Sequence, residues 1–498
     1  MKQRNSNDAL FRLIKSMSAG EKRFFHLMCS RQSSANGKSY LQLFNAIDKQ
    51  EQNDESKIKE LFNKEGVHFI ETKRYLYKQV LDTLVQHFRG RNEKNAYNTL
   101  LELDVLYEKG LYDQHELLLG KLRKTAEEKE DFLVLMDVVK REKRYHNLRF
   151  KYTDIKKMRK LRELEDLYAA QHKEVEEYRE LSNEIIYYHN EQRFIGSKAF
   201  MQIKDRPLFK DLEKPASLTA KLILYNLRAI YFSTLSFPEV AKVEYAQAVR
   251  ILQSNPEYSN SNPAYASSTY MNYIANCVNL AEYEVALKGV VAYKKFLLNF
   301  PELTKHKIIL LLAYEFNVYR ETGKKNEAIE LLSQIENKMD SGEAMAEIGN
   351  KFYLYFQAGY AFLEFGDNHS SIKWLNKILN YPAAEKLSFL YYYNARILQL
   401  LNLIDIKDEE LLRYRIKSFQ RLMLKRKRVS DADKMLIDFF SKVLKEKLLT
   451  DRKGLSHQMK ELKKSLKISV DSPTENEVLL SVPDISSWLE LVIKRIGD

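Results

Sequence analysis

The chain has 498 residues and a formal net charge of +13 at pH 7, and 45% of its residues are hydrophobic while 30% are charged. This balance excludes a disordered chain and allows several domains, or one long array, with ample core. Only 9 prolines and 15 glycines are present, too few for a strand-and-turn protein, and two cysteines exclude a disulfide scaffold, so we expect an all-α fold.

The N-terminal residues contain no apolar run of signal-peptide length. The longest apolar stretch, IILLLAY at 308–314, is too short to cross a bilayer. We therefore expect a cytoplasmic protein without a membrane span.

Residues 1–95 are expected to form a small helical domain. Ser18-Ala-Gly-Glu21 is a capping-box pattern that predicts a helix start. The opening LIKS at 13–16, followed by EKR and two phenylalanines at 21–25, resembles the start of an uncharacterised group of bacterial tetratricopeptide-like proteins. This resemblance covers some twenty residues and implies an architecture without an activity.

A possible DNA-reading element lies at 58–76, IKELFNKEGVHFIETKRYL. It loosely resembles a helix-turn-helix, with Gly66-Val67 as the turn and Thr72, Lys73 and Arg74 on the helix that would enter a groove. The alternative is a plain helical hairpin, which the length of the second helix favours.

Enzyme signatures are not found. Gly37-Lys38-Ser39 matches the end of a phosphate-binding loop, but Gln32 stands where that loop needs its first glycine. His26 and Cys29 could share a metal or form a nucleophile pair, and packing in a core is the alternative. We expect a non-enzyme without metal or cofactor.

Residues 96–205 are expected to form a helix pair around Gly110 and a long helical hairpin at 131–190. Within the hairpin, residues 140–162 carry eleven Lys or Arg and two acids, interleaved with aromatic residues. This composition is compatible with nucleic-acid binding, and a solvated helix face is the alternative.

Residues 206–429 contain an internal repeat. Gly359 and Ser371 are small residues where two helices could cross closely, and Gly366 between them could end the first helix in the left-handed conformation. The small residue of the second helix recurs at 241, 286, 328 and 371. The pattern resembles the tetratricopeptide repeat, whose unit is about 34 residues. It implies a right-handed α-solenoid with longer units, ending in a pair at 388–425 whose turn, LNLIDIKDE, is extended.

In that family, the first helix of each pair lines a concave groove. The corresponding positions here are Asn226, Asn272, Asn279, Asn317, Arg320, Gln357 and Tyr360. Asparagine is a poor helix former, and its amide can both donate to and accept from an extended peptide. The layout resembles receptors for small signalling peptides, and asparagines that merely solvate an empty groove are the alternative. With a single arginine, the set does not match the carboxylate clamp of chaperone-binding relatives.

A basic stripe follows near the end of the array. Its cations recur at about four-residue spacing, opposite an apolar face, and are Arg413, Lys417, Arg421, Lys425 and Arg428. Like charges at this spacing repel one another unless a polyanion or acidic partner neutralises them, and a solvated face is again the alternative. Residues 430–498 are expected to be capping helices and a tail with a short final helix.

Taken together, these features favour an adaptor or scaffold that binds a protein or peptide in a concave groove. The alternative is a nucleic-acid-binding regulator that uses the basic helix faces and the segment 58–76. The sequence does not specify the oligomeric state.

Overall fold

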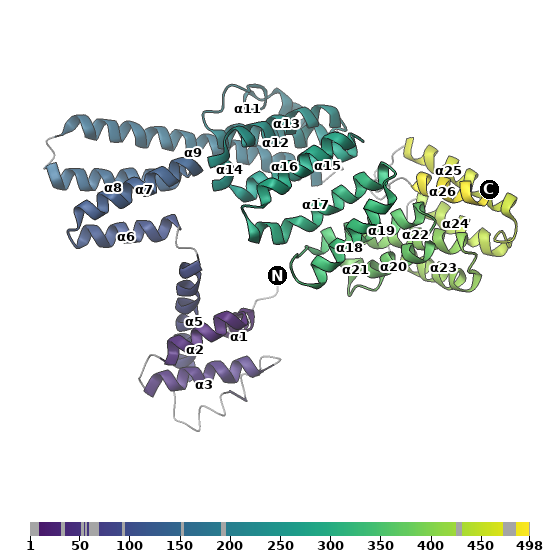
Figure 1. Ribbon diagram of the computed structural model, residues 1–498, viewed down its shortest axis with the longest axis horizontal. Coiled ribbons are helices and arrows are strands. Elements are labelled where there is room, and N and C mark those ends of the chain that lie inside the picture. Colours follow the sequence, from purple (N-terminus) through teal and green to yellow (C-terminus); the bar gives the residue numbers. More distant parts are fainter. Residues whose placement is uncertain are drawn as a thin grey trace. The chain divides into compact units, whose positions relative to one another are not determined.

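The computed structural model describes residues 9–30, 35–50, 54, 57–58, 69–91, 95–150, 154–190, 196–424, 431–471 and 485–497 (Figure 1). Every regular element among these residues is a helix, which confirms the all-α prediction. The chain divides into two compact units, residues 1–127 with 131–169 and residues 128–130 with 170–498. The four domains expected from the sequence, 1–95, 96–205, 206–429 and 430–498, stay a prediction.

The first unit begins with a small helical core. Phe25 stacks on Phe44 with ring centroids 4.4 Å apart, and Leu76 and Val80 are fully buried beside them. The predicted capping box is confirmed, because the backbone N–H of Ser18 donates to Glu21 Oε2 at 2.7 Å. The helices of this core are α1 (Ala9–Ser16), α2 (Ala19–Ser30), α3 (Ala35–Lys49) and α5 (Phe69–Arg91).

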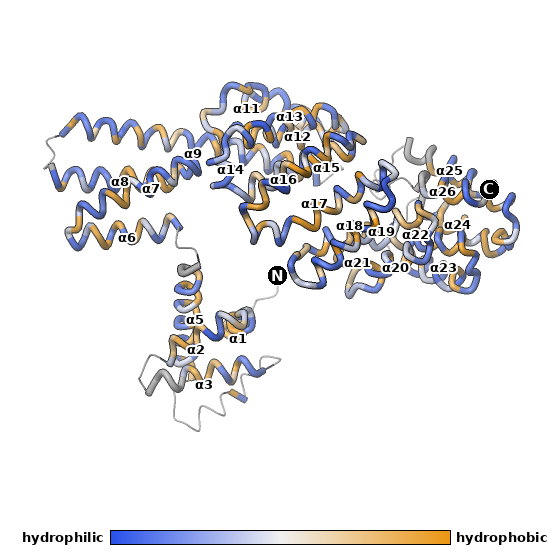
Figure 2. Tube along the Cα trace, in the orientation of Figure 1, coloured by the Kyte–Doolittle hydropathy of each residue, from blue (hydrophilic) through white to orange (hydrophobic). Residues whose placement is uncertain are grey.

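Four longer helices follow, and the predicted hairpin is formed by the last two. Antiparallel pairing of α8 with α9 is held by ion pairs of Lys143 with Glu165 at 2.6 Å and of Lys157 with Glu142 at 3.4 Å. Hydrophobic and hydrophilic residues alternate along both helices (Figure 2). At 36 residues, α9 is longer than α8, which has 19. The part of α9 from residue 170 onward belongs to the second unit. These helices are α6 (Ala96–Glu108), α7 (Tyr112–Lys129), α8 (Phe132–Phe150) and α9 (Ile155–Asn190).

The second unit is a series of helix pairs packed in a solenoid-like manner, each pair against the next. The pairs are α12 (Leu218–Thr234) with α13 (Pro238–Ser254), α15 (Pro263–Asn279) with α16 (Tyr283–Leu297), α17 (Pro301–Glu321) with α18 (Lys325–Asp340), α19 (Ile348–Glu364) with α20 (Asn368–Leu379), α22 (Phe389–Asp405) with α23 (Glu409–Leu424), and α24 (Asp431–Lys445) with α25 (Arg452–Asp471). Short helices lie before and between them: α10 (Lys198–Gln202), η3 (Ile203–Asp205), α11 (Pro207–Lys210), α14 (Pro256–Ser261) and α21 (Ala384–Leu387). The last helix is α26 (Ile485–Gly497).

One turn geometry joins the helices of five pairs. A residue with positive φ stands five positions before a fully buried residue of the second helix: Ser236 before Ala241, Ala281 before Ala286, Gly323 before Ala328, Gly366 before Ser371, and Lys407 before Leu412. The predicted extended turn at 401–409 is therefore wrong, since α22 continues to Asp405 and Lys407 takes the left-handed position. A side chain in this conformation costs about 1–2 kcal/mol, which the buried crossing of the two helices offsets.

The crossing of α19 and α20 is the closest approach that the sequence predicted. The hydroxyl of Ser371 donates to the carbonyl oxygen of Gly359 at 2.6 Å. A Cβ atom on Gly359 would lie 2.6 Å from Leu375 Cδ2, so only glycine fits without a shift. The equivalent residues Ala229 and Ala241 are both fully buried in one cluster. The predicted close approach of Gly359 and Ser371 is confirmed.

Candidate binding site

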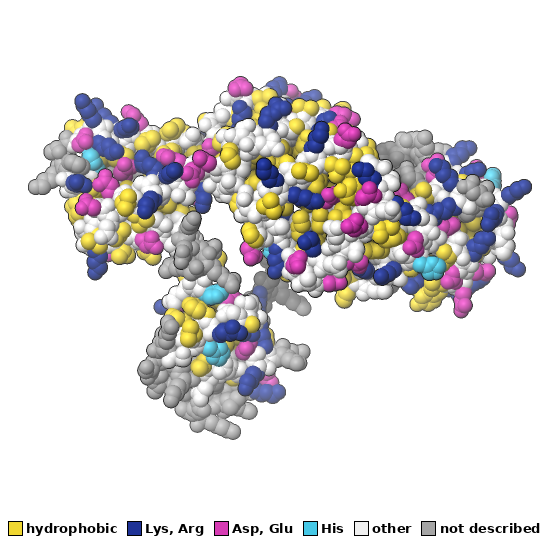
Figure 3. All heavy atoms as spheres, in the orientation of Figure 1, with side chains coloured by type: hydrophobic (Ala, Val, Ile, Leu, Met, Phe, Trp, Pro, Cys, Tyr) yellow, Lys and Arg dark blue, Asp and Glu magenta, His cyan; other side chains and the backbone are white. Residues whose placement is uncertain are grey.

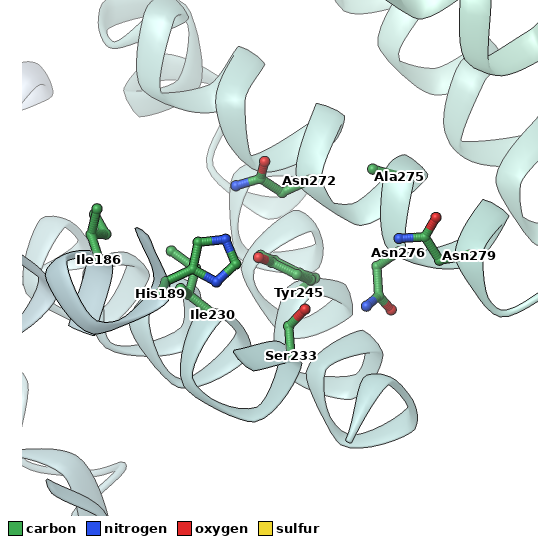
Figure 4. A pocket seen from close by; sticks show the side chains of 9 residues that line it. All are labelled: Ile186, His189, Ile230, Ser233, Tyr245, Asn272, Ala275, Asn276 and Asn279. Carbon is green, nitrogen blue, oxygen red and sulfur yellow. The ribbon is translucent and has the colours of Figure 1, made fainter. Parts of the chain in front are cut away.

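A pocket of about 260 Å³ opens in the second unit among α9, α12, α13 and α15 (Figure 4). Among the residues that the structure describes, none of the side chains on its walls is an Asp, Glu, Lys or Arg. The lining residues are Ile186, His189, Ile230, Ser233, Tyr245, Asn272, Ala275, Asn276 and Asn279. Two of the predicted groove residues, Asn272 and Asn279, thus lie in one site.

Three asparagines on one face of α15 form one wall of the pocket. Asn272 and Asn279 are exposed. Asn276 lies between them and is only 5% exposed, and its buried Oδ1 accepts no hydrogen bond. A buried acceptor without a partner costs about 1–3 kcal/mol, so the structure holds this atom at the pocket wall at a cost. The sequence analysis missed Asn276, although its four-residue offset from Asn272 could have indicated it.

Tyr245 of α13 contributes a second buried polar group to the pocket. Its side chain is 6% exposed, and its hydroxyl makes no hydrogen bond with the described residues. Burial raises the pKa of Tyr245 above the ordinary value for tyrosine, so the phenol stays neutral at physiological pH. A neutral phenol can either donate or accept a hydrogen bond.

His189 of α9 faces Tyr245 across the pocket (Figure 4). Its Nδ1 lies 2.9 Å from Thr234 Oγ1. That hydroxyl already donates its one hydrogen to the carbonyl oxygen of Ile230 at 2.7 Å. Thr234 therefore accepts from His189 Nδ1, and in the neutral form of the imidazole this leaves the lone pair on Nε2. Sequence reasoning did not predict His189, because it lies on the long helix assigned to the hairpin.

The other predicted groove residues have partners within the chain. The amide nitrogen of Asn226 donates to Tyr265 Oη at 3.1 Å and to Thr269 Oγ1 at 3.2 Å. Asn317 Nδ2 donates to Tyr353 Oη at 2.6 Å. These two amides tie neighbouring pairs of the array together and do not line the pocket.

Arg320, Gln357 and Tyr360 form a separate cluster between α17 and α19. Arg320 Nη1 donates to Gln357 Oε1 at 2.8 Å, and the guanidinium lies 4.7 Å from the centre of the Tyr360 ring. Arg320 Nε also lies 3.3 Å from Glu364 Oε2. Burial raises the pKa of the Glu364 carboxyl, and the attraction of Arg320 opposes that rise.

The last helix, α26, covers part of this cluster. The ring of Trp488 lies 5.7 Å from Phe356 and 6.1 Å from Tyr360, and it is fully buried. At the other end of the helix, Arg495 Nη1 donates to Asp405 Oδ2 at 2.9 Å. The chain's own C-terminal helix thus occupies the surface on which the sequence analysis placed Tyr360.

The basic stripe lies on α23. Arg413, Lys417 and Arg421 are exposed, while the opposite face of the helix is buried. Arg413 pairs with Glu409 at 2.8 Å, whereas Lys417 and Arg421 form no ion pair with the described residues. Lys425 and Arg428 lie outside the residues that the structure describes.

The basic segment 140–162 and the segment 58–76 lie in the first unit. Lys, Arg, Asp and Glu side chains intermingle over α6–α9 (Figure 3). Several cations of 140–162 have carboxylate partners: Arg141 with Asp104, Lys143 with Glu165, Arg149 with Glu116, Lys157 with Glu142 and Arg162 with Asp166. In 58–76, Thr72 is buried and Arg74 is exposed, and Gly66 and Val67 lie outside the described residues.

The structure also places the residues that were considered for metal or nucleophile chemistry. The His26 ring lies edge-on to Phe44 at 5.5 Å, and burial raises the pKa of the Cys29 thiol. Both observations favour packing. Within the described part of the chain, no group of three His, Cys, Asp or Glu side chains could hold a metal ion. Of the described helices, none has the length and apolar character that a bilayer crossing requires.

Comparison of the chain with protein-family models, with curated proteins and with solved structures gives no match. The arguments for function therefore come from the geometry of this chain alone.

Proposed function

We propose that this protein is a tetratricopeptide-like adaptor, a right-handed solenoid that binds a peptide segment of a partner at the pocket among α9, α12 and α15. The observation that carries the proposal is Asn276, whose amide oxygen is buried at the pocket wall without a partner. Other buried polar atoms of the described residues also lack a partner, Asn317 Oδ1 and Arg320 Nε among them, and Asn276 Oδ1 is distinguished by its place on the pocket wall. A ligand that donates to this oxygen satisfies it.

The flanking asparagines extend the same surface. Asn272 and Asn279 are exposed on the same helix, and each offers both a donor and an acceptor. Such amides suit the main chain of an extended peptide. A surface of this kind binds and orients a partner, and we propose no catalytic role.

The test is selection of a phage-displayed random heptapeptide library on the full-length protein. We expect recovery of related peptides, and we expect Asn272→Ala with Asn279→Ala to weaken their binding about tenfold or more, since each lost hydrogen bond is worth about 0.5–1.5 kcal/mol. The matched control is Asn299→Ala with Asn326→Ala, which alters two exposed asparagines outside the pocket. Unchanged binding by the pocket variant, with helicity and melting intact, would falsify the proposal.

A second candidate function is nucleic-acid binding by α23. The observation that favours it is that Lys417 and Arg421 are exposed and have no acidic partner among the described residues. Neutralised phosphates give a log–log salt dependence of about 0.9 per contact on B-DNA. Replacing both Lys417 and Arg421 by Gln should therefore lower the log–log slope of the binding constant against salt concentration by about two. An unchanged slope, or no binding to a 30-base-pair duplex at 50 mM salt, excludes this candidate.

A further inference from the structure

We infer that the pocket recognises an uncharged carboxamide, and that His189 Nε2 and Asn276 Oδ1 accept hydrogen bonds from it. This inference rests on the proposed peptide-binding function and specifies the chemistry that the peptide must present.

The hydrogen-bonding capacity of the pocket is the first argument. Asn276 Oδ1 is a buried acceptor without a partner, and His189 Nε2 is an acceptor because Nδ1 carries the hydrogen. Asn276 Oδ1 is buried and needs a donor from the ligand, whereas His189 is exposed and its Nε2 exchanges a water for a ligand donor. The hydroxyl of Tyr245 and the amides of Asn272 and Asn279 add donors that can reach a carbonyl oxygen. A carboxamide offers N–H and C=O together, so it can match both kinds of group.

The absence of charge from the nine lining residues is the second argument. Among the described lining residues a carboxylate or an ammonium group meets no counter-ion, so no ion pair compensates for the water that it loses there. A purely apolar group leaves the buried amide oxygen of Asn276 unsatisfied. An uncharged polar group avoids both penalties.

The size of the pocket is the third argument. A volume of about 260 Å³ lies below the range of about 300–1,000 Å³ that accommodates drug-sized ligands. A pocket below that range fits a single side chain or peptide group better than a whole drug-sized molecule. The carboxamide can come from a glutamine or asparagine side chain or from the peptide main chain.

The experiment uses the heptapeptides recovered with the full-length protein. We expect the recovered peptides to be enriched in Gln or Asn at one position, or to share a core in which one main-chain amide is essential for binding. Replacing the enriched Gln by Glu in a synthetic peptide should weaken binding at least tenfold if its side chain is read. N-methylation of single peptide bonds should weaken binding to the same extent if the pocket binds the main chain of the peptide. Enrichment of Asp, Glu, Lys or Arg at the essential position, or tolerance of both changes, overturns the inference.

Two substitutions of His189 separate a ligand contact from a structural role. His189→Asn places an amide nitrogen near the position of Nδ1, so it can keep the bond to Thr234 while removing the acceptor at Nε2. His189→Gln places an amide oxygen near the position of Nε2. We expect His189→Asn to weaken peptide binding about five- to tenfold at an unchanged melting temperature, because it keeps the bond to Thr234. We expect His189→Gln to restore most of the binding, although it loses that bond. Equal binding by wild type and His189→Asn overturns the role of Nε2.

The outcomes distinguish the inference from the function on which it rests. If no heptapeptide is recovered, the proposed peptide-binding function fails. If peptides are recovered and depend on Asn272 and Asn279, but contain a charged residue at the essential position, the function stands and only the carboxamide inference fails.

Discussion

Two polar surfaces of the array show why residue type alone does not define a binding site. The pocket beside α15 and the cluster around Arg320 both contain residues that the sequence predicted to line a groove. In the cluster, Arg320 is engaged by Gln357, Tyr360 and Glu364, and α26 packs over it through Trp488. In the pocket, the amide oxygen of Asn276 has no partner. Arg320 Nε and Asn317 Oδ1 also lack a hydrogen-bond partner, so an unsatisfied atom alone does not mark a binding site. Asn276 differs because it lies on the wall of a pocket, between the exposed side chains of Asn272 and Asn279.

The largest expected effect is a loss of stability on removing Trp488, the side chain through which α26 packs on the array. Trp488 is fully buried against Phe356 and Tyr360. Substitution of a buried Trp by Ala costs about 3–5 kcal/mol, because apolar contacts are lost and a cavity remains. Urea unfolding of Trp488→Ala should show this loss.

Trp488→Phe is the milder variant in the same experiment. The indole Nε1 is buried and donates no hydrogen bond, so Phe loses volume but no polar contact. We expect a much smaller loss of stability than for Ala, and unchanged heptapeptide binding at the pocket. A loss below about 1 kcal/mol for Trp488→Ala means that α26 does not occupy this surface in solution.

The next effect concerns the helix crossing that underlies the array. Gly359→Leu places a side chain where even a Cβ atom would lie 2.6 Å from Leu375 Cδ2. Overpacking of this kind costs about 1–3 kcal/mol or more. The matched control is Gly349→Ala on the same helix, where a Cβ atom meets nothing within 4 Å. That control lies in the first turn of the helix, so it should gain less than the roughly 0.5–1 kcal/mol of a mid-helix Gly→Ala change. Equal thermal shifts for the two variants contradict the crossing.

This crossing was predictable from sequence, and the pocket was only partly so. Small residues at Gly359 and Ser371 specify a close approach because the sterics are local to one helix pair. The turn at Lys407 was predicted wrongly because a lysine side chain gives no indication of a left-handed backbone conformation. His189 could not be assigned, because its helix begins in the first unit and reaches the pocket only through tertiary packing. Asn276 and Asn317 cannot be told apart by residue type. Both have a buried Oδ1 without a partner, and they differ because Asn317 Nδ2 donates to Tyr353.

A smaller effect compares those two asparagines directly. Asn317→Leu removes the donor to Tyr353 and leaves a buried hydroxyl unsatisfied, which should cost about 1–2 kcal/mol. Asn276→Leu removes an acceptor that has no partner, so it should be neutral or should stabilise the fold by up to about 1 kcal/mol. Asn276→Leu should nevertheless weaken peptide binding, and Asn317→Leu should not. Thermal melting and peptide titration of both variants test this opposite behaviour, and a destabilised Asn276→Leu protein assigns Asn276 a structural role instead.

The smallest expected effect is a pH dependence that belongs to the Arg320 cluster alone. Burial raises the pKa of Glu364 in the folded protein, against the opposing attraction of Arg320. The folded state therefore binds the Glu364 proton more tightly than the unfolded state does. The resulting stability is complete below the ordinary glutamate pKa and is lost as the pH rises through the folded-state value. Glu364→Gln imitates the protonated carboxyl at every pH, so it should match wild type in acid and should be the more stable protein at pH 7. Urea midpoints at several pH values from 4 to 7 measure this difference. If wild type is the more stable protein at pH 7, the ion pair with Arg320 outweighs the desolvation of Glu364, and the charged carboxylate stabilises the cluster.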